Sequence, residues 1–186
     1  MILPIVAFGS FILRQKCKYI SSSYPNLQRV ISNMFETMYA ASGVGLAAPQ
    51  VNKSIRIFII DTTPFAQDED LEMVPVKQVF INPRIIKEEG QEWLFNEGCL
   101  SIPEIREDIY RRPNIEIEFF DEEFKLRNKK FDGITARIIQ HEYDHLNGVL
   151  FIDKISPLRK QLIKGKLTDI TKGNIRVDYK IKFSKK

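Results

Sequence analysis

The chain has 186 residues, 44% of them hydrophobic, and a formal net charge of +4. This length and composition suffice to bury a core and fit one domain better than two. No segment approaches the ~20 apolar residues that a membrane-spanning helix needs, and the apolar residues 1–13 lack the basic start and small-residue cleavage site of a signal peptide. The sequence therefore argues against a membrane protein, and we expect a soluble, cytoplasmic protein with no membrane partner.

The first part of the sequence predicts one helix followed by strands. Residues 25–41 place apolar side chains at helical spacing, and Gly43 ends the pattern. The segment GVGLAAPQ at 43–50 is too rich in Gly and Ala to be a strong strand. Strands are predicted at 55–60, 78–87, 91–95, 115–120 and 124–131, with a surface excursion over the Pro- and acid-rich residues 62–75. We expect these strands to be mutually antiparallel.

The last part of the sequence returns to helical periodicity. Asp132 is the predicted N-cap and Gly148 the predicted stop of a helix that carries both histidines. A second helix is predicted over 157–171, and an edge-type strand over 177–183. The residues of that second helix expected to face inward are Leu158, Leu162, Ile163, Leu167 and Ile170.

The only two histidines of the chain lie four residues apart, in the sequence H-E-Y-D-H at 141–145. On an α-helix this spacing places both imidazoles on one face, so His141 and His145 can bind a single metal ion. Glu142 then reaches a water molecule at that same ion. The motif predicts a metal-dependent hydrolase with Glu142 as its general base.

A catalytic metal site usually takes three protein ligands and leaves one position open. Downstream of His145 there is no further His, Cys or Glu, and the remaining downstream candidates are Asp153, Asp169 and Asp178. Upstream, Cys99 lies in EGCLS at 97–101, in a glycine-containing break between strand-like segments. In a reducing compartment a cysteine is more often buried, metal-bound or reactive than disulfide-bonded. The other cysteine, Cys17, is expected to be an ordinary buried residue.

Two other classes of function stay open at this point. A zinc endopeptidase would share the H-E-x-x-H pattern but should take its third ligand from downstream and have an open cleft. A non-enzymatic nucleic-acid- or ribosome-binding module would explain the pI of about 9.0 but not the metal ligands.

Three motifs in a fixed order make the chain resemble the peptide deformylases. They are GVGLAAPQ at 43–50, EGCLS at 97–101 and QHEYDH at 140–145. Further similarity runs through ILPIV at 2–6, SIPEIR at 101–106 and HLNGVLFID at 145–153. The resemblance covers most of residues 1–157, and it implies a hydrolase that removes the formyl group from N-formylmethionyl nascent peptides and releases formate.

The resemblance implies a role for individual residues. Cys99, His141 and His145 would bind the metal, and Glu142 would be the general base and acid. The Gln50 amide and the Leu100 backbone N–H would stabilise the oxyanion. The residues implied in substrate binding are Val44, Gly45, Arg106, Ile134 and Ile138, although Gly45 also reads as a turn glycine and the three aliphatic residues as core.

The resemblance also implies one divalent metal ion per chain, with Fe²⁺ as the usual native ion. Cysteine and histidine ligands suit Zn²⁺, Ni²⁺ and Co²⁺ as well, so ligand types alone do not select the metal. We further expect a buried ion pair of Glu97 with Arg111 that supports the cysteine segment.

The predicted fold class is α+β, with antiparallel strands packed around a central HExxH helix and with a C-terminal helix and short edge strand. Residues 1–156 should form the catalytic domain, and 157–186 a basic extension of the same domain. From Lys154 onward the chain has eleven Lys or Arg against two Asp, a net +9 that leaves −5 for residues 1–153. Such charge is typical of a solvated surface. Ribosomal RNA, however, is a polyanion that attracts basic residues. Members of the resembling family can dock on ribosomes through their C-terminal segment, which implies the same partner here. The residues that would contact the ribosome are Arg159, Lys160, Lys164 and Lys166.

Overall fold

The computed structural model describes residues 1–65 and 74–183, so most of the predicted excursion at 62–75 lies outside the described residues. The helices are α1 (Leu27–Ala40), α2 (Gly133–Leu146) and α3 (Pro157–Lys172), with short 3₁₀ turns η1 (Phe11–Arg14), η2 (Ala48–Val51) and η4 (Phe151–Asp153). The strands are β1 (Ile5–Val6), β2 (Gly45–Ala47), β3 (Ile57–Asp61), β4 (Lys77–Glu89), β5 (Trp93–Cys99), β6 (Ile102–Arg111), β7 (Asn114–Phe120), β8 (Leu126–Phe131) and β9 (Ile181–Lys182).

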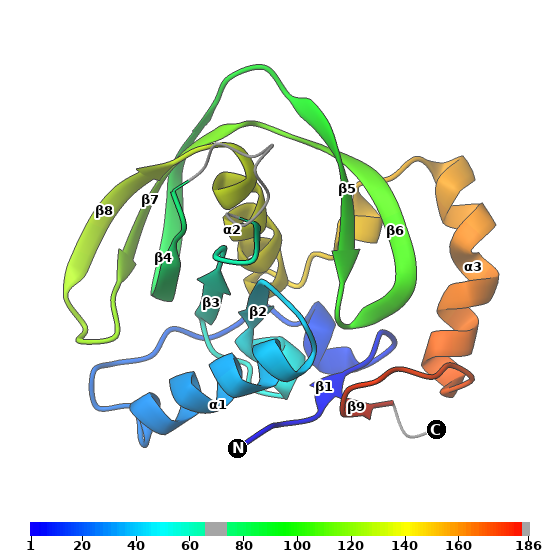
Figure 1. Ribbon diagram of the computed structural model, residues 1–186, viewed down its shortest axis with the longest axis horizontal. Helices are drawn as coiled ribbons and strands as arrows, with labels where there is room; N and C mark the ends of the chain where they lie inside the picture. Colours follow the sequence, from blue (N-terminus) through cyan, green and yellow to red (C-terminus); the bar gives the residue numbers. More distant parts are fainter. Residues whose placement is uncertain (66–73, 184–186) are drawn as a thin grey trace.

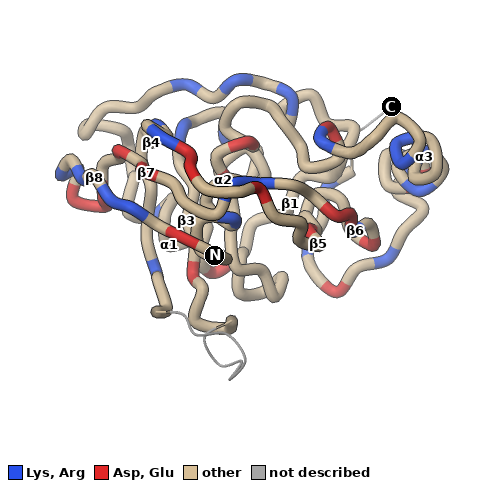
Figure 2. The backbone as a smooth tube through the Cα atoms, turned by 90° about the horizontal axis from the view of Figure 1, so that it is seen from above, with Lys and Arg blue, Asp and Glu red and all other residues tan. Residues whose placement is uncertain are grey.

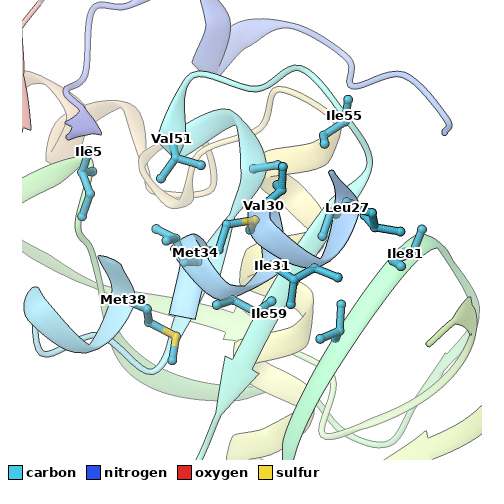
Figure 3. Packing of buried hydrophobic residues seen from close by; sticks show 14 of the residues in the cluster. Ile5, Leu27, Val30, Ile31, Met34, Met38, Val51, Ile55, Ile59 and Ile81 are labelled. Carbon is cyan, nitrogen blue, oxygen red and sulfur yellow. The ribbon is translucent and has the colours of Figure 1, made fainter. Parts of the chain in front are cut away.

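A five-stranded antiparallel sheet in the order β2-β3-β4-β7-β8 separates the two main hydrophobic clusters. Its strand β3 is buried on both faces because its side chains alternate between the clusters. Ile57 and Ile59 pack with α1, as Figure 3 shows for Ile59 beside Ile31 and Met34. Phe58 and Ile60 pack on the other face with residues of α2.

Helix α2 lies in the middle of the molecule, between the five-stranded sheet and the antiparallel hairpin β5–β6 (Figure 1). The hairpin belongs to a third hydrophobic cluster, in which Ile102, Ile105 and Ile109 of β6 pack with residues of η4 and α3. The expected α+β arrangement of antiparallel strands around the histidine-bearing helix is confirmed.

The C-terminal end of α2 is held by Arg56, a residue only 2% exposed at the start of β3. Its Nη1 donates to the carbonyl of Leu146, the last residue of α2, and its Nη2 donates to the carbonyl of Pro83. A cation at this end of a helix also interacts favourably with the helix dipole. Arg56 therefore fixes the histidine-bearing helix against both β3 and β4.

Three strands were not predicted from the sequence, namely the two-residue β1 and the strands β2 and β6. In β6 the side chains alternate between buried and exposed, but the buried positions include Glu107 and Arg111, which hide the apolar alternation. In β2 two of the three residues, Gly45 and Ala47, are small, and α2 passes close to Gly45, where a Cβ would lie 2.5 Å from Oε1 of Glu142. The expected break at 97–101 is correct only in part: it is a tight turn at Leu100 and Ser101, while Cys99 is still the last residue of β5.

The inward face predicted for α3 is correct only in part. Ile163 and Ile170 are buried, but Leu158 is 70% and Leu162 is 63% exposed, so those two assignments are wrong. The helix lies at one side of the molecule (Figure 1), where its buried residues Ile163 and Ile170 share a hydrophobic cluster with residues of β6.

Beyond α3, residues 174–183 form a segment, here called the tail, that folds back to the N-terminus. The predicted strand there is limited to β9, which pairs with β1 in parallel and not in an antiparallel arrangement. Ile163 and Ile170 share a cluster with Ile102, which favours residues 157–186 as part of one domain with the rest. The domain boundary at residue 156 stays a prediction. No helix within the described ranges is long and apolar enough to cross a membrane.

The position of Arg56 predicts that Arg56→Met destabilises the protein by about 2–4 kcal/mol, because hydrogen bonds from a charged donor are lost and a buried carbonyl is left unpaired. Arg84→Met is the matched control, since Arg84 is 64% exposed in its ion pair with Glu118 and should cost less than about 1 kcal/mol. Urea unfolding of both variants measures the difference. Equal stabilities would show that Arg56 does not secure α2.

Candidate metal centre

Cys99, His141 and His145 come together between the β5–β6 turn and α2. One ligand atom from each lies within 4.8 Å of the others, and the Cys99 Sγ is 3.2 Å from Nε2 of His145. The two imidazoles lie one helical turn apart, as their spacing predicts, with ring centroids 5.1 Å apart. Among the described residues this is the one group of three His, Cys, Asp or Glu side chains close enough to hold an ion.

The downstream acids considered as alternative ligands do not join this group. Asp153 accepts hydrogen bonds from the Arg14 guanidinium and from the Leu150 N–H instead.

Cys17, expected to be an ordinary buried residue, is 4% exposed, and burial raises the pKa of its thiol to about 11.

The Glu97 carboxylate orients one of the two imidazoles. Its Oε2 lies 3.0 Å from Nδ1 of His141, which leaves the opposite nitrogen, Nε2, for an ion. The expected ion pair is confirmed: Arg111 Nε donates to Oε1 of Glu97 at 2.7 Å, and both side chains are 4% exposed. Burial alone would raise the pKa of Glu97, but hydrogen bonds from His141 and Arg111 hold it well below its ordinary value.

A second arginine, which was not predicted from the sequence, binds the same carboxylate. Arg137 Nη1 donates to Glu97 at 2.8 Å, and its guanidinium carbon lies 4.4 Å from the centre of the Trp93 ring. The sequence could have indicated this residue, because Arg137 lies one turn before His141 and on the same face of the helix. Arg111 also pairs with Asp144 at 2.7 Å, so two guanidinium groups face two carboxylates.

Glu142 lies in the same buried region and is 5% exposed. Burial raises the pKa of its carboxyl to about 7. Within the described part of the chain its Oε2 accepts no hydrogen bond, and the Nδ1 of His145 likewise has no partner. Burial and the charge of His141 lower the pKa of His145.

The Gln50 side chain is fixed on the other side of Cys99. Its Oε1 accepts the Ala47 N–H at 2.8 Å. Its Nε2 is therefore turned toward Ser101 Oγ at 3.2 Å and Cys99 Sγ at 3.5 Å. An amide donor beside a cysteine sulfur suits a thiolate better than a thiol. Ser101, which is fully buried, is a further residue that sequence analysis did not single out.

A cavity of about 470 Å³ opens beside these groups. Cys99, His141, Glu142, Gln50 and Leu100 all line it. Every residue expected to bind substrate lines it too, namely Val44, Gly45, Arg106, Ile134 and Ile138. The remaining walls include Phe95 and Tyr179, which sequence analysis did not predict.

Gly45 has a structural reason to lack a side chain. A Cβ there would lie 2.5 Å from Oε1 of Glu142, so any larger residue must displace that carboxylate. Arg106 lies at the exposed rim, where its Nε donates to Oδ1 of Asn96 and its Nη2 to the Asn96 carbonyl, both at 2.7 Å.

The donor set fits a divalent metal ion. One thiolate and two imidazoles within 4.8 Å are typical of a catalytic centre with a fourth position for water or substrate. The second nitrogen of His141 has the carboxylate partner that ligating histidines usually have.

Comparisons with known proteins agree with this geometry. The family model for polypeptide deformylase matches residues 2–161. A peptide deformylase of Flavobacterium johnsoniae is 56% identical over 99% of this chain and 97% of its own length. One from Christiangramia forsetii is 53% identical over 98% of this chain and 96% of its own.

Solved structures give the same result. The crystal structure of a peptide deformylase from Legionella pneumophila superposes with a TM-score of 0.81 and 34% identity, covering 95% of this chain and 99% of that one. The enzyme from Thermotoga maritima gives 0.74 at 39% identity, covering 84% of this chain and 99% of that one. The alternative of a zinc endopeptidase finds no support. The chain belongs to the polypeptide deformylase family, hydrolases that remove the formyl group from the N-terminus of peptides.

Proposed function

We propose that Cys99, His141 and His145 hold one divalent ion, and that Glu142 moves the protons of formyl hydrolysis. The observation that carries this proposal is the convergence of the three donor atoms within 4.8 Å beside a buried carboxylate in one cavity. A divalent ion bound by this set would supply Lewis acidity, which lowers the pKa of water from about 15.7 toward 7. The family resemblance favours Fe²⁺, while Zn²⁺, Ni²⁺ and Co²⁺ suit the same ligands.

Glu142 is the group that accepts a proton from the attacking water at its carboxylate and returns it to the leaving amine. A pKa of about 7 suits both directions of transfer at neutral pH. Its unpartnered Oε2 is available for this exchange, since no other described residue donates to it. Formate and a free N-terminus are the products.

Gln50 and the Leu100 N–H are the proposed donors to the oxyanion that forms at the formyl carbon. Support comes from the fixed direction of the Gln50 amide, whose Nε2 lies 3.5 Å from Cys99. Donors that are already oriented need no reorganisation when charge develops.

The substrate that this cavity suits is an N-formylmethionyl nascent peptide. Val44, Ile134 and Ile138 offer apolar walls for the methionine side chain, and the exposed Arg106 is placed at the rim for the following residues. Gly45 leaves room for the Glu142 carboxylate and thus for substrate beside it.

The test of this function is formate release from formyl-Met-Ala-Ser by the metal-loaded enzyme. Glu142→Ala should keep its metal yet lose ~10²–10⁴ of its turnover, because a general base contributes that much. Glu123→Ala, a change at an exposed turn residue, is the control. Full turnover by Glu142→Ala with a full metal complement would remove Glu142 from the mechanism.

The ligand assignment predicts different results for the two cysteines. Cys99→Ser should weaken metal affinity at least as much as loss of an outer-shell partner does, about 10–100-fold. Cys17→Ser should not, since Cys17 is buried outside the donor group. Metal content after dialysis against a chelator measures both. Equal retention by the two variants would contradict Cys99 as a ligand.

We also propose that the basic surface of α3 docks on the ribosome, where nascent peptides emerge. Figure 2 marks the basic residues along this helix. Arg159 is less suited than expected, because its guanidinium makes two bonds of 2.8 Å with Glu107. Lys160 donates to the carbonyl of Asp153. The exposed Lys164, Lys166 and Lys172 make no side-chain bond within the described chain and are the better candidates for phosphate contacts.

Replacing Lys164, Lys166 and Lys172 with glutamate should reduce co-sedimentation with ribosomes at low salt, because each lost phosphate contact weakens binding and flattens its salt dependence. Hydrolysis of free formyl-Met-Ala-Ser should stay unchanged. The matched control reverses Lys16, Lys18 and Lys130, which are exposed on other parts of the chain. If both triple variants sediment like the parent, the charge of α3 is a solvated surface only.

A further inference from the structure

The tail contributes a residue to the cavity from outside the matched family segment. The family model ends at residue 161, yet Tyr179 lines the cavity together with Cys99, Leu100 and Glu142. Figure 1 shows the tail leaving α3 and passing below the β5–β6 turn to reach β1. Pairing of Ile181 with Ile5 fixes its course two residues beyond Tyr179.

The Tyr179 hydroxyl makes one well-defined contact. It donates to the backbone carbonyl of Leu100 at 2.7 Å. Its ring packs with Leu100 against the cluster that includes α1. Burial raises the pKa of the phenol to about 12, so the hydroxyl remains a donor across the neutral range.

Leu100 belongs to the turn that joins β5 to β6 and follows Cys99 directly. The same turn is held elsewhere by Ser101, whose hydroxyl receives the Gln50 amide and whose carbonyl receives the Phe8 N–H at 2.8 Å. Tyr179 holds the remaining carbonyl of the turn. Without this bond no other described residue donates to the Leu100 carbonyl, and only solvent can do so. The Leu100 N–H belongs to the preceding peptide group of the same turn, and its orientation then depends on a turn with one fewer constraint.

We propose that Tyr179 is a positioning residue for deformylation: its hydroxyl fixes the Leu100 turn so that the Leu100 N–H is aimed at the developing oxyanion, while its ring closes one wall of the substrate cavity. This inference rests on the proposed role of Leu100. It differs from metal binding because the Tyr179 hydroxyl donates to the carbonyl of Leu100, and Tyr179 is not one of the three ligand residues.

A positioning role predicts separate effects on kcat and KM. In the full-length, metal-loaded enzyme, Tyr179→Phe should lower kcat for formyl-Met-Ala-Ser about tenfold, or about 1.4 kcal/mol of transition-state stabilisation. KM, metal content and Tm should stay near the parent values, since the ring remains. Tyr179→Leu should lower kcat similarly and also raise KM, because the wall is lost.

Tyr39→Phe is the matched control. The Tyr39 hydroxyl also makes a short bond, 2.6 Å to Asp61, but Tyr39 does not line the cavity. Loss of that bond should leave kcat unchanged.

Three results would overturn the inference. They are a parental kcat in Tyr179→Phe, a fall in kcat fully explained by lost metal, and an equal fall in Tyr39→Phe. Activity of the parent enzyme, and its loss in Glu142→Ala, are measured in the same series. A parent that released no formate would contradict the proposed function itself, so the two failures are distinguishable.

Discussion

The buried Glu97 carboxylate is the constraint on which the rest of the site depends. An isolated carboxylate at this depth would be strongly unfavourable, and two arginines and one imidazole compensate it. These partners come from β6 and α2, while Glu97 itself lies in β5. One charge therefore joins the hairpin to the histidine-bearing helix and at the same time sets the direction of His141. Removing it would release the ligands from two elements together.

On the opposite side of α2, the close approach of β2 completes the enclosure of Glu142. Gly45 lets α2 approach β2 closely, and Arg56 secures the far end of the helix. Glu142 is thereby confined between β2 and the cavity, which is why its pKa lies near neutrality while Glu97, equally buried, stays ionised. Two carboxylates of similar exposure thus differ because, of the two, only Glu97 accepts hydrogen bonds from cationic side chains of the described residues.

The sequence could predict what depends on local spacing. The separation of His141 and His145 by one turn, the end of α2 near Gly148 and the strand at 115–120 are all periodic signals. It could not predict what depends on tertiary pairing. Strand β6 was missed because Glu107 and Arg111 face inward and are neutralised only by distant partners. Leu158 and Leu162 have helical spacing, yet α3 lies at the edge of the molecule where nothing in the described chain covers them. Tyr179 gave no signal at all, since its contact spans 79 positions of sequence.

The pairing of β1 with β9 has a consequence for the order of folding. Residues 5 and 181 become neighbours only when nearly the whole chain is closed into one loop. The entropic cost of closing a loop grows only slowly with its length. The contact can nevertheless form only after its second partner, residue 181, has been synthesised. The hairpin, the five-stranded sheet and α2 draw on earlier residues and have shorter separations, which favour faster formation. The metal ligands would thus assemble before the tail arrives, and the Leu100 turn would receive its restraint from Tyr179 only afterwards.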